Sequence, residues 1–152
     1  MNEIRRMVLR GAGAAAMLAA GLVATGRAFA ATWNKDAFGA KNSHDALASL
    51  GAQNAVQSKD VIIEAPEIAE NGAVVPIEVS SQVPGTRSIS VLIEKNPFPL
   101  TAKFDFTPEA VPFLKINVKI SESSLVRVVA EAGGKHFAAS REIKVTIGGC
   151  GG

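Results

Sequence analysis

The segment from Phe113 to Ser121 alternates apolar and polar side chains with a period of two residues. Its apolar positions are Leu114, Ile116, Val118 and Ile120, and the positions between them hold Lys115, Asn117 and Lys119. Successive side chains of a β-strand point to opposite faces of the sheet, so the pattern predicts a strand with one buried and one solvated face. Such a strand needs a second layer to cover its apolar side.

Other segments with the same character indicate that the fold is mainly β. Strands are predicted around 61–63, 74–79, 89–93, 125–132 and 135–139, and in a final strand where Ile143, Val145 and Ile147 point inward. Asn71-Gly72, Pro84-Gly85 and Gly133-Gly134 are turn signals, and the two prolines of Asn96-Pro97-Phe98-Pro99 break a central strand. About seven short strands at this spacing predict an immunoglobulin-like antiparallel β-sandwich over residues 59–147.

Residues 31–58 precede the first predicted strand and are expected to be mostly helical, up to residue 57. Ser43 is the expected N-cap, and Ala46, Leu47 and Leu50 form an apolar stripe that Gly51 ends. Trp33 and Phe38 are interpreted as hydrophobic anchors of this segment rather than as binding residues.

The first 30 residues have the composition of an export leader. Arg5-Arg6 precede an apolar run from Gly11 to Gly26, and Ala28-Phe29-Ala30 is a small-residue cleavage site. This is the pattern of a twin-arginine signal peptide, with cleavage expected after Ala30 and a periplasmic destination. The run is too short and too rich in Ala and Gly for a good membrane span, so no span is expected in the mature protein.

The leader also carries most of the positive charge. It holds four of the 16 Lys+Arg residues and one of the 14 Asp+Glu residues, so its removal changes the net charge from +2 to −1. A nucleic-acid-binding domain needs a basic patch on the mature protein. The sequence therefore gives no support for nucleic-acid binding.

No group of residues in the predicted body has the spacing of a catalytic or metal site. His44 and His136 lie in different regions without neighbouring ligands, and Glu67 and Glu70 are interpreted as solvated loop charges. Nucleotide-binding and Cys-x-x-Cys motifs are missing. We therefore expect no cofactor, no metal and no catalytic activity of the chain's own.

The single cysteine, Cys150, lies between Gly148-Gly149 and Gly151-Gly152 at the end of the sequence. Glycine side chains offer nothing to anchor, so residues 148–152 are expected to form a flexible, thin, swinging carrier arm. The three residues from Ile147 to Cys150 would carry the thiol roughly 10 Å beyond the last strand. A thiolate is a nucleophile, and with no basic neighbour in sequence its activation would come from a partner's active site. This arrangement favours a covalent carrier over an enzyme.

Two plainer interpretations of the tail stay open. Gly-rich termini are commonly frayed, and a lone exposed cysteine in an exported protein often forms an intermolecular disulfide. The second interpretation describes a structural subunit held by Cys150-linked dimers.

The terminal sequence Val145-Thr-Ile-Gly-Gly-Cys-Gly-Gly152 resembles the signature of the SoxY family, the sulfur-carrying subunits of the periplasmic thiosulfate-oxidising Sox system. Ala37–Ala40, Ala65–Pro76 and Lys95–Leu100 are similar to the family as well, and so is the twin-arginine leader. The resemblance implies a carrier whose Cys150 thiol is the attachment point for thiosulfate-derived sulfur.

The resemblance also implies a set of partners. A small β-sandwich subunit of the SoxZ type would form the heterodimer. A haem-containing cytochrome would join thiosulfate to Cys150 as an S-thiosulfonate, a manganese-dependent hydrolase would release sulfate, and a sulfane dehydrogenase, where present, would oxidise the remaining persulfide sulfur. The haem and the metals belong to these partners.

Gly151-Gly152 also resembles the terminus of ubiquitin-like sulfur carriers, which load sulfur as a C-terminal thiocarboxylate after activation by ATP. Export to a compartment without ATP speaks against this alternative. So does a strand pattern that lacks the long central helix of those carriers.

Overall fold

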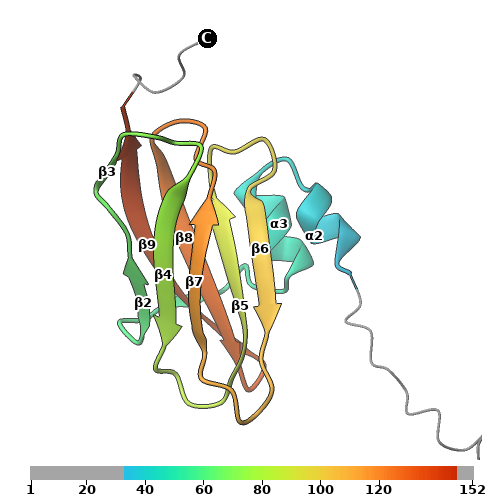
Figure 1. The fold of residues 1–152 in the computed structure, drawn as a ribbon. Helices are drawn as coiled ribbons and strands as arrows, with labels where there is room; N and C mark the ends of the chain where they lie inside the picture. The colour runs from blue at the N-terminus through green and yellow to red at the C-terminus, as the bar shows by residue number, and fades with distance from the viewer. Residues whose placement is uncertain (1–32, 147–152) are drawn as a thin grey trace, which may run out of the picture. The chain divides into compact units, whose positions relative to one another are not determined.

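The structure is a computed structural model that describes residues 33–146 (Figure 1). The predicted leader (1–30) and the predicted arm (148–152), including Cys150, lie outside the described residues. The chain divides into residues 1–33, of which Trp33 alone is described, and a compact unit that begins at Asn34.

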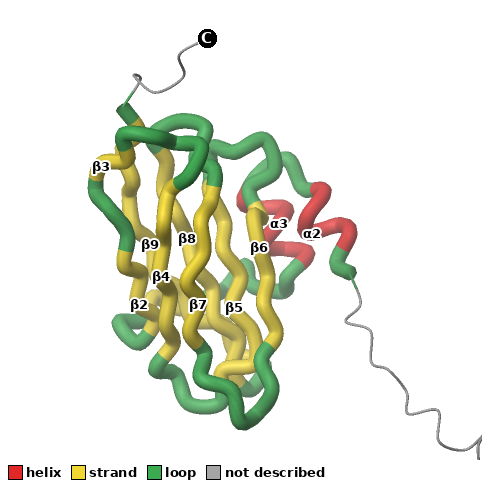
Figure 2. Tube along the Cα trace, in the orientation of Figure 1, coloured by secondary structure: helices red, strands yellow, loops and turns green. Residues whose placement is uncertain are grey.

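The described residues form two short helices and two β-sheets (Figures 1 and 2). The elements are α2 (Lys35–Gly39), α3 (Ser43–Ser49), β1 (Val56–Gln57), β2 (Val61–Glu64), β3 (Ile68–Ala69), β4 (Val75–Ser81), β5 (Thr86–Ile93), β6 (Leu100–Asp105), β7 (Phe113–Val118), β8 (Ser124–Ala132) and β9 (Lys135–Val145). The larger sheet has the order β1-β9-β8-β5-β6, with β3 also paired to β9, and the smaller sheet has the order β2-β4-β7. The predicted immunoglobulin-like sandwich is confirmed.

The main core fills the space between the two sheets. Its fully buried side chains include Ile77 from β4, Ile89 and Val91 from β5, Val128 from β8 and Ile143 from β9. Leu114, Val118 and Ile120 are buried as the alternation predicts, and Ile116 is partly buried against the same core. Burial of these side chains is the main stabilising term of the sandwich.

A second, smaller core lies on the other face of the larger sheet, beneath the helices. Ala37 and Leu47 from the helices meet Leu92 of β5, Val129 of β8 and Ala138 of β9 there. Strand β5 therefore has apolar neighbours on both faces, and its last six residues are all buried. The helices thus add a third layer to the sandwich and cover what would be an exposed apolar face.

The helical segment differs from the prediction in two respects. Helix α3 is capped by Asn42, whose side-chain oxygen accepts a hydrogen bond from the Asp45 amide at 2.9 Å, and Ser43 is its first residue. The predicted continuous helix is two short ones, α2 and α3, and residues 56–57 are already strand β1. Gly51, at φ +69°, follows α3 as predicted because its left-handed conformation stops the helix.

Three strand assignments also need correction. The predicted strands at 135–139 and 142–147 are one eleven-residue strand, β9, within the described part of the chain. Strand β6 is absent from the sequence-based prediction, because four of its six residues are only half-buried and the segment lacks a clean alternation. The sandwich is not wholly antiparallel, since β1 and β3 each pair with β9 in parallel.

The predicted turns occur where the sequence places them. Gly133 and Gly134 both have positive φ in the β8–β9 hairpin, which is the geometry of a type I′ turn. Asn71-Gly72 forms a turn between β3 and β4, which belong to different sheets, and Gly72 does not have a positive φ. Among residues 33–146, no helix is long and apolar enough to cross a membrane.

Candidate functional site at the end of the final strand

Strand β9 ends at Val145, and Thr146 is the last described residue, so the predicted carrier arm begins at this end of the sandwich (Figure 1). Cys150 and the flanking Gly148, Gly149, Gly151 and Gly152 lie outside the described residues. The part of the site that the structure describes is the attachment of the arm to the body.

On one side, β3 holds the end of β9 by parallel pairing. The Lys144 amide donates a hydrogen bond to the Glu67 carbonyl at 2.9 Å, and the Thr146 amide donates one to the Ala69 carbonyl at 3.1 Å. The two-residue strand β3 therefore fixes the backbone of β9 up to Thr146, the residue directly before Ile147.

A serine holds the same end of β9 through both of its hydrogen-bonding capacities. The Val145 amide donates to Ser123 Oγ at 2.9 Å, and Ser123 Oγ lies 3.4 Å from the Val145 carbonyl oxygen, to which it donates. Ser123 directly precedes β8, and its side chain here replaces the backbone partner that a longer β8 would give to β9. We call β3 and Ser123 together the terminal clamp.

Gly72 lies against the terminal clamp at a point where a side chain would not fit. A Cβ atom on this residue would lie 2.4 Å from the Ile120 carbonyl oxygen and 2.9 Å from Val145 Cγ1. The Ile120 amide also donates to the Gly72 carbonyl at 2.7 Å. Close backbone approach, rather than an unusual φ, is therefore the reason for glycine here.

Asn96 connects two further loops at this end. Its side-chain amide donates to the Lys119 carbonyl at 2.8 Å, and its side-chain oxygen accepts from the Ser121 amide at 3.1 Å. The β5–β6 loop and the β7–β8 loop are thereby joined. The surface from which the arm would leave is consequently a connected, hydrogen-bonded platform.

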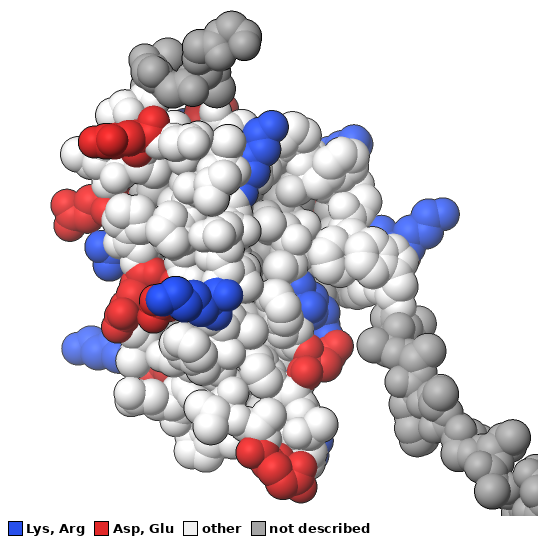
Figure 3. Space-filling view, viewed as in Figure 1, with Lys and Arg blue, Asp and Glu red and all other residues white. Residues whose placement is uncertain are grey.

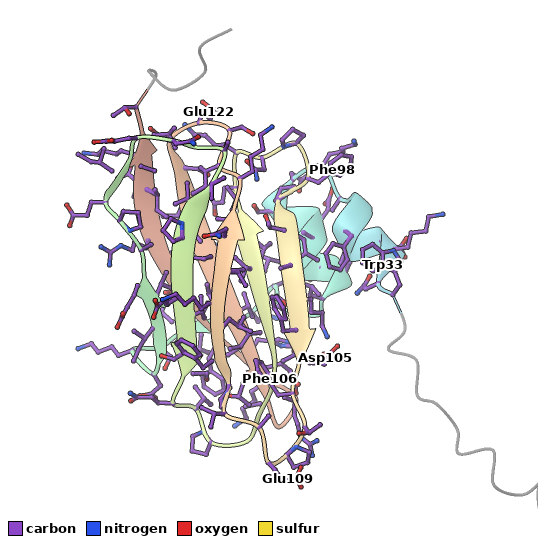
Figure 4. The ribbon with its side chains drawn as sticks, in the orientation of Figure 1. Trp33, Phe98, Asp105, Phe106, Glu109 and Glu122 are labelled. Carbon is purple, nitrogen blue, oxygen red and sulfur yellow. The ribbon has the colours of Figure 1, made fainter. Side chains whose placement is uncertain are left out.

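The residues around the end of β9 are exposed and of mixed character. Ile68 and Val74 are 57% and 56% exposed, although both are large apolar side chains. Glu70, in the same segment as Ile68 and Val74, and Glu122 are also exposed, and Figure 4 shows Glu122 at the end of the sandwich where β9 stops. Acidic and basic side chains are interspersed over the face seen in Figure 3.

The other residues considered from the sequence lie in three different segments. His44 is exposed on α3 and His136 is half-buried on β9, while Glu67 and Glu70 are exposed in the segment around β3. Within residues 33–146, no group of three or more His, Cys, Asp or Glu side chains could hold a metal ion. The Glu78 carboxylate on β4 accepts a hydrogen bond from the Lys115 ammonium on β7, and this contact raises the pKa of Lys115. Both residues are far in sequence from the end of β9.

The terminal clamp could not be identified from the sequence. Ser123 and Val145 are 22 positions apart, and the sequence around Ser123 reads only as a polar turn. The Asn71-Gly72 pair predicts a turn, but its contact with Ile120 and Val145 depends on how the sheets pack.

Comparisons with known proteins identify relatives over most of the described residues. The family model described as "Sulfur oxidation protein SoxY" matches residues 46–150. The solved structure of the sulfur carrier protein SoxY from Chlorobium limicola f thiosulfatophilum is 39% identical, with a TM-score of 0.62, over 68% of this chain and 94% of that chain. A comparison with curated proteins gives no match.

A second solved structure is similar in fold alone. The superoxide reductase (neelaredoxin) from Ignicoccus hospitalis is 23% identical, with a TM-score of 0.51, over 57% of this chain and 79% of that chain. At this level of identity the likeness extends to the sandwich and to nothing of its chemistry.

Proposed function

The chain belongs to the SoxY family of sulfur oxidation proteins, and on that premise we propose that it is a periplasmic carrier that holds thiosulfate-derived sulfur on the thiol of Cys150. The observation that carries this proposal is the extent of the family match, which runs from residue 46 to residue 150 and so includes the cysteine. The 39% identical SoxY structure, a sulfur carrier protein, supports the same role.

The proposed chemistry adds and removes sulfur at one atom. The Cys150 thiolate and thiosulfate form an S–S bond, giving the cysteine S-thiosulfonate, and two electrons pass to a haem-containing partner. Water then attacks the sulfonate sulfur and the S–S bond to it breaks, which releases sulfate and two protons and leaves a persulfide anion. The chain supplies the thiol, and partner enzymes supply the haem and the metal.

The terminal clamp suits a carrier because it separates a fixed body from its reactive end. The hydrogen bonds at Lys144, Val145 and Thr146 hold the last described residues on both sides. Tethering raises the effective concentration of an intermediate at each enzyme that the tether can reach. We propose that residues 148–152 are that tether, and that Gly149 and Gly151 leave room around the thiol in a narrow pocket.

We further propose the partners and the compartment that the family resemblance implies. The twin-arginine leader would export the folded chain with a SoxZ-type β-sandwich subunit. The thiosulfate-conjugating cytochrome, a manganese-dependent sulfate-releasing hydrolase and, where present, a sulfane dehydrogenase would then act on Cys150 in turn. The chain itself would be a substrate of these enzymes rather than a catalyst.

The test is the intact mass of the protein purified from the periplasm, before and after reduction, beside a Cys150→Ser control. We expect additions of sulfur or thiosulfate that the reductant removes and that the control lacks. An unmodified monomer, or a disulfide dimer alone, after incubation with thiosulfate and the conjugating cytochrome would overturn the proposal and favour the structural-subunit alternative. The same spectra give the mature N-terminus, expected at Ala31.

A further inference from the structure

The four-residue step from Thr146 to Cys150 limits how far the thiol can lie from the body. Thr146 is fixed by its hydrogen bond to Ala69, and Cys150 is four positions further along the chain. An extended chain spans at most about 3.3–3.6 Å per residue, so the Cys150 α-carbon lies within roughly 13–14 Å of the Thr146 α-carbon. This upper limit depends only on the number of residues between Thr146 and Cys150 and on the position of Thr146.

A partner's pocket uses most of that length. Small-molecule pockets have volumes of about 300–1,000 Å³, which corresponds to depths of roughly 7–10 Å. With the thiol at the bottom of such a pocket, about 5 Å of chain is left between the pocket mouth and the body. The rim of the pocket must therefore touch the residues around the end of β9.

Those residues include two apolar side chains that the fold leaves uncovered. Ile68 and Val74 are the first and last residues of a seven-residue segment that contacts the end of β9. Within this segment, Ala69 accepts the hydrogen bond from Thr146, and Gly72 lies against Val145. Ile68 also lines a surface hollow of about 360 Å³ with Arg141, Glu142 and Lys144. Two exposed apolar side chains at the two ends of one short segment, one of them among charged residues, offer the small apolar area that transient contacts use.

We infer, on the basis of the proposed function, that Ile68 and Val74 form a docking surface for the enzymes that receive the arm, and that these enzymes present an apolar rim around the pocket for Cys150. The occupant is an enzyme rather than the SoxZ-type subunit because both residues belong to the segment that holds the end of β9, where the proposed tether begins. Each enzyme must leave again, so a small contact area is sufficient.

The chain offers a matched control for each residue. Val56 is 63% exposed on β1, and β1 pairs in parallel with β9, as β3 does. Val56 lies opposite Phe137 of β9, whereas Ile68 lies opposite Lys144. These two partners lie seven positions apart along β9, which is about 23 Å and beyond the reach of the arm. Val111 is 79% exposed in the loop before β7, near Glu109, which Figure 4 shows at the opposite end of the sandwich from Glu122.

The experiment compares the double variant Ile68→Ser/Val74→Ser with the control variant Val56→Ser/Val111→Ser. Each variant is prepared as the heterodimer with the SoxZ-type subunit. Serine leaves the net charge unchanged, so electrostatic steering is not altered. The purified thiosulfate-conjugating cytochrome loads thiosulfate, and intact mass gives KM and kcat for the carrier. A second measurement gives the rate at which iodoacetamide alkylates Cys150, which needs no docking.

We expect KM for the Ile68/Val74 variant to rise about tenfold or more, because the two substitutions together remove the apolar side chains at the centre of a small contact. We expect kcat, the alkylation rate and the melting temperature to stay unchanged, and the control variant to behave as the wild type. A KM within twofold of the wild type, or an equal rise in the control, would overturn the inference. If the wild-type protein takes up no sulfur at all, the proposed function fails instead.

Discussion

At the scale of single residues, the structure reassigns the cap of helix α3. Asn42 accepts the hydrogen bond that a cap requires, whereas Ser43, the cap expected from the sequence, has a buried hydroxyl oxygen with no hydrogen-bond partner among the described residues. The two positions are adjacent and both residue types are good caps. The sequence alone therefore did not discriminate between them.

This difference can be measured by two alanine substitutions. We expect Asn42→Ala to lower the free energy of unfolding by about 1 kcal/mol, because the Asp45 amide loses its acceptor. We expect Ser43→Ala to leave it unchanged within about 0.5 kcal/mol or to raise it, since it removes an unsatisfied buried hydroxyl. Urea denaturation of both variants checks the assignment, and the reverse order of effects would restore Ser43 as the cap.

Gly72 lies against Val145 at the end of β9, where the proposed arm begins. Gly72→Ala would force its Cβ into the Ile120 carbonyl oxygen, only 2.4 Å away, so that the backbone of one loop must shift. Overpacking of this kind typically costs about 1–3 kcal/mol of the free energy of unfolding.

Gly39, the last residue of α2, provides the control. It has no positive φ and nothing lies within 4 Å of the position of its Cβ, so Gly39→Ala should be neutral or stabilise the protein by up to about 1 kcal/mol. Thermal and urea unfolding of the two variants test the contrast. Equal stability of both would mean that the loop at Gly72 adjusts freely.

At the scale of elements, the strands that could be predicted are those whose sequence either alternates apolar and polar side chains or is a continuous apolar run. Strands β4 and β7 alternate in burial and were recognised, as was the buried run of β5. Strands β1 and β3 have two residues each and exist because β9 offers them a parallel partner. No local pattern distinguishes such segments from loops, so tertiary pairing had to reveal them.

The terminal clamp belongs to this class of feature, and Ser123→Ala tests it. The substitution removes the acceptor of the Val145 amide, which is expected to lower the free energy of unfolding by about 1–2 kcal/mol. The amide of Val145 should exchange its hydrogen faster, while amides of the β8–β9 hairpin should not change.

Ser121→Ala is the matched control for the clamp. Ser121 is exposed two positions earlier, and its hydrogen bond to Asn96 is made by its backbone amide, which the substitution keeps. Stability and exchange should match the wild type. If Ser123→Ala behaved in the same way, β3 alone would hold the end of β9.

At the scale of the whole molecule, two cores share the larger sheet. The inter-sheet core includes Ile89, Val91 and Ile93 of β5, and the core beneath the helices includes Leu92 of the same strand. A body stabilised on both faces of its main sheet needs no disulfide. Its final strand, β9, contributes to both cores through Ile143 and Ala138 and then continues into the terminal clamp.

This arrangement predicts that stability and carrier function can be separated by where the chain is cut. A chain ending at Thr146 keeps all the clamp hydrogen bonds, so its free energy of unfolding should match that of the full chain within about 0.5 kcal/mol.

A chain ending at Ile143 loses the hydrogen bonds of Lys144, Val145 and Thr146 and the partly buried Val145 side chain, at a cost of about 2–4 kcal/mol. On the proposed function, neither chain takes up sulfur, because both lack Cys150. Urea denaturation tests the two free energies of unfolding. Intact mass after incubation with thiosulfate and the conjugating cytochrome tests the expected absence of sulfur uptake. A large loss of stability on removing residues 147–152 alone would show that the arm is part of the folded body, and the limit on its reach would then need revision.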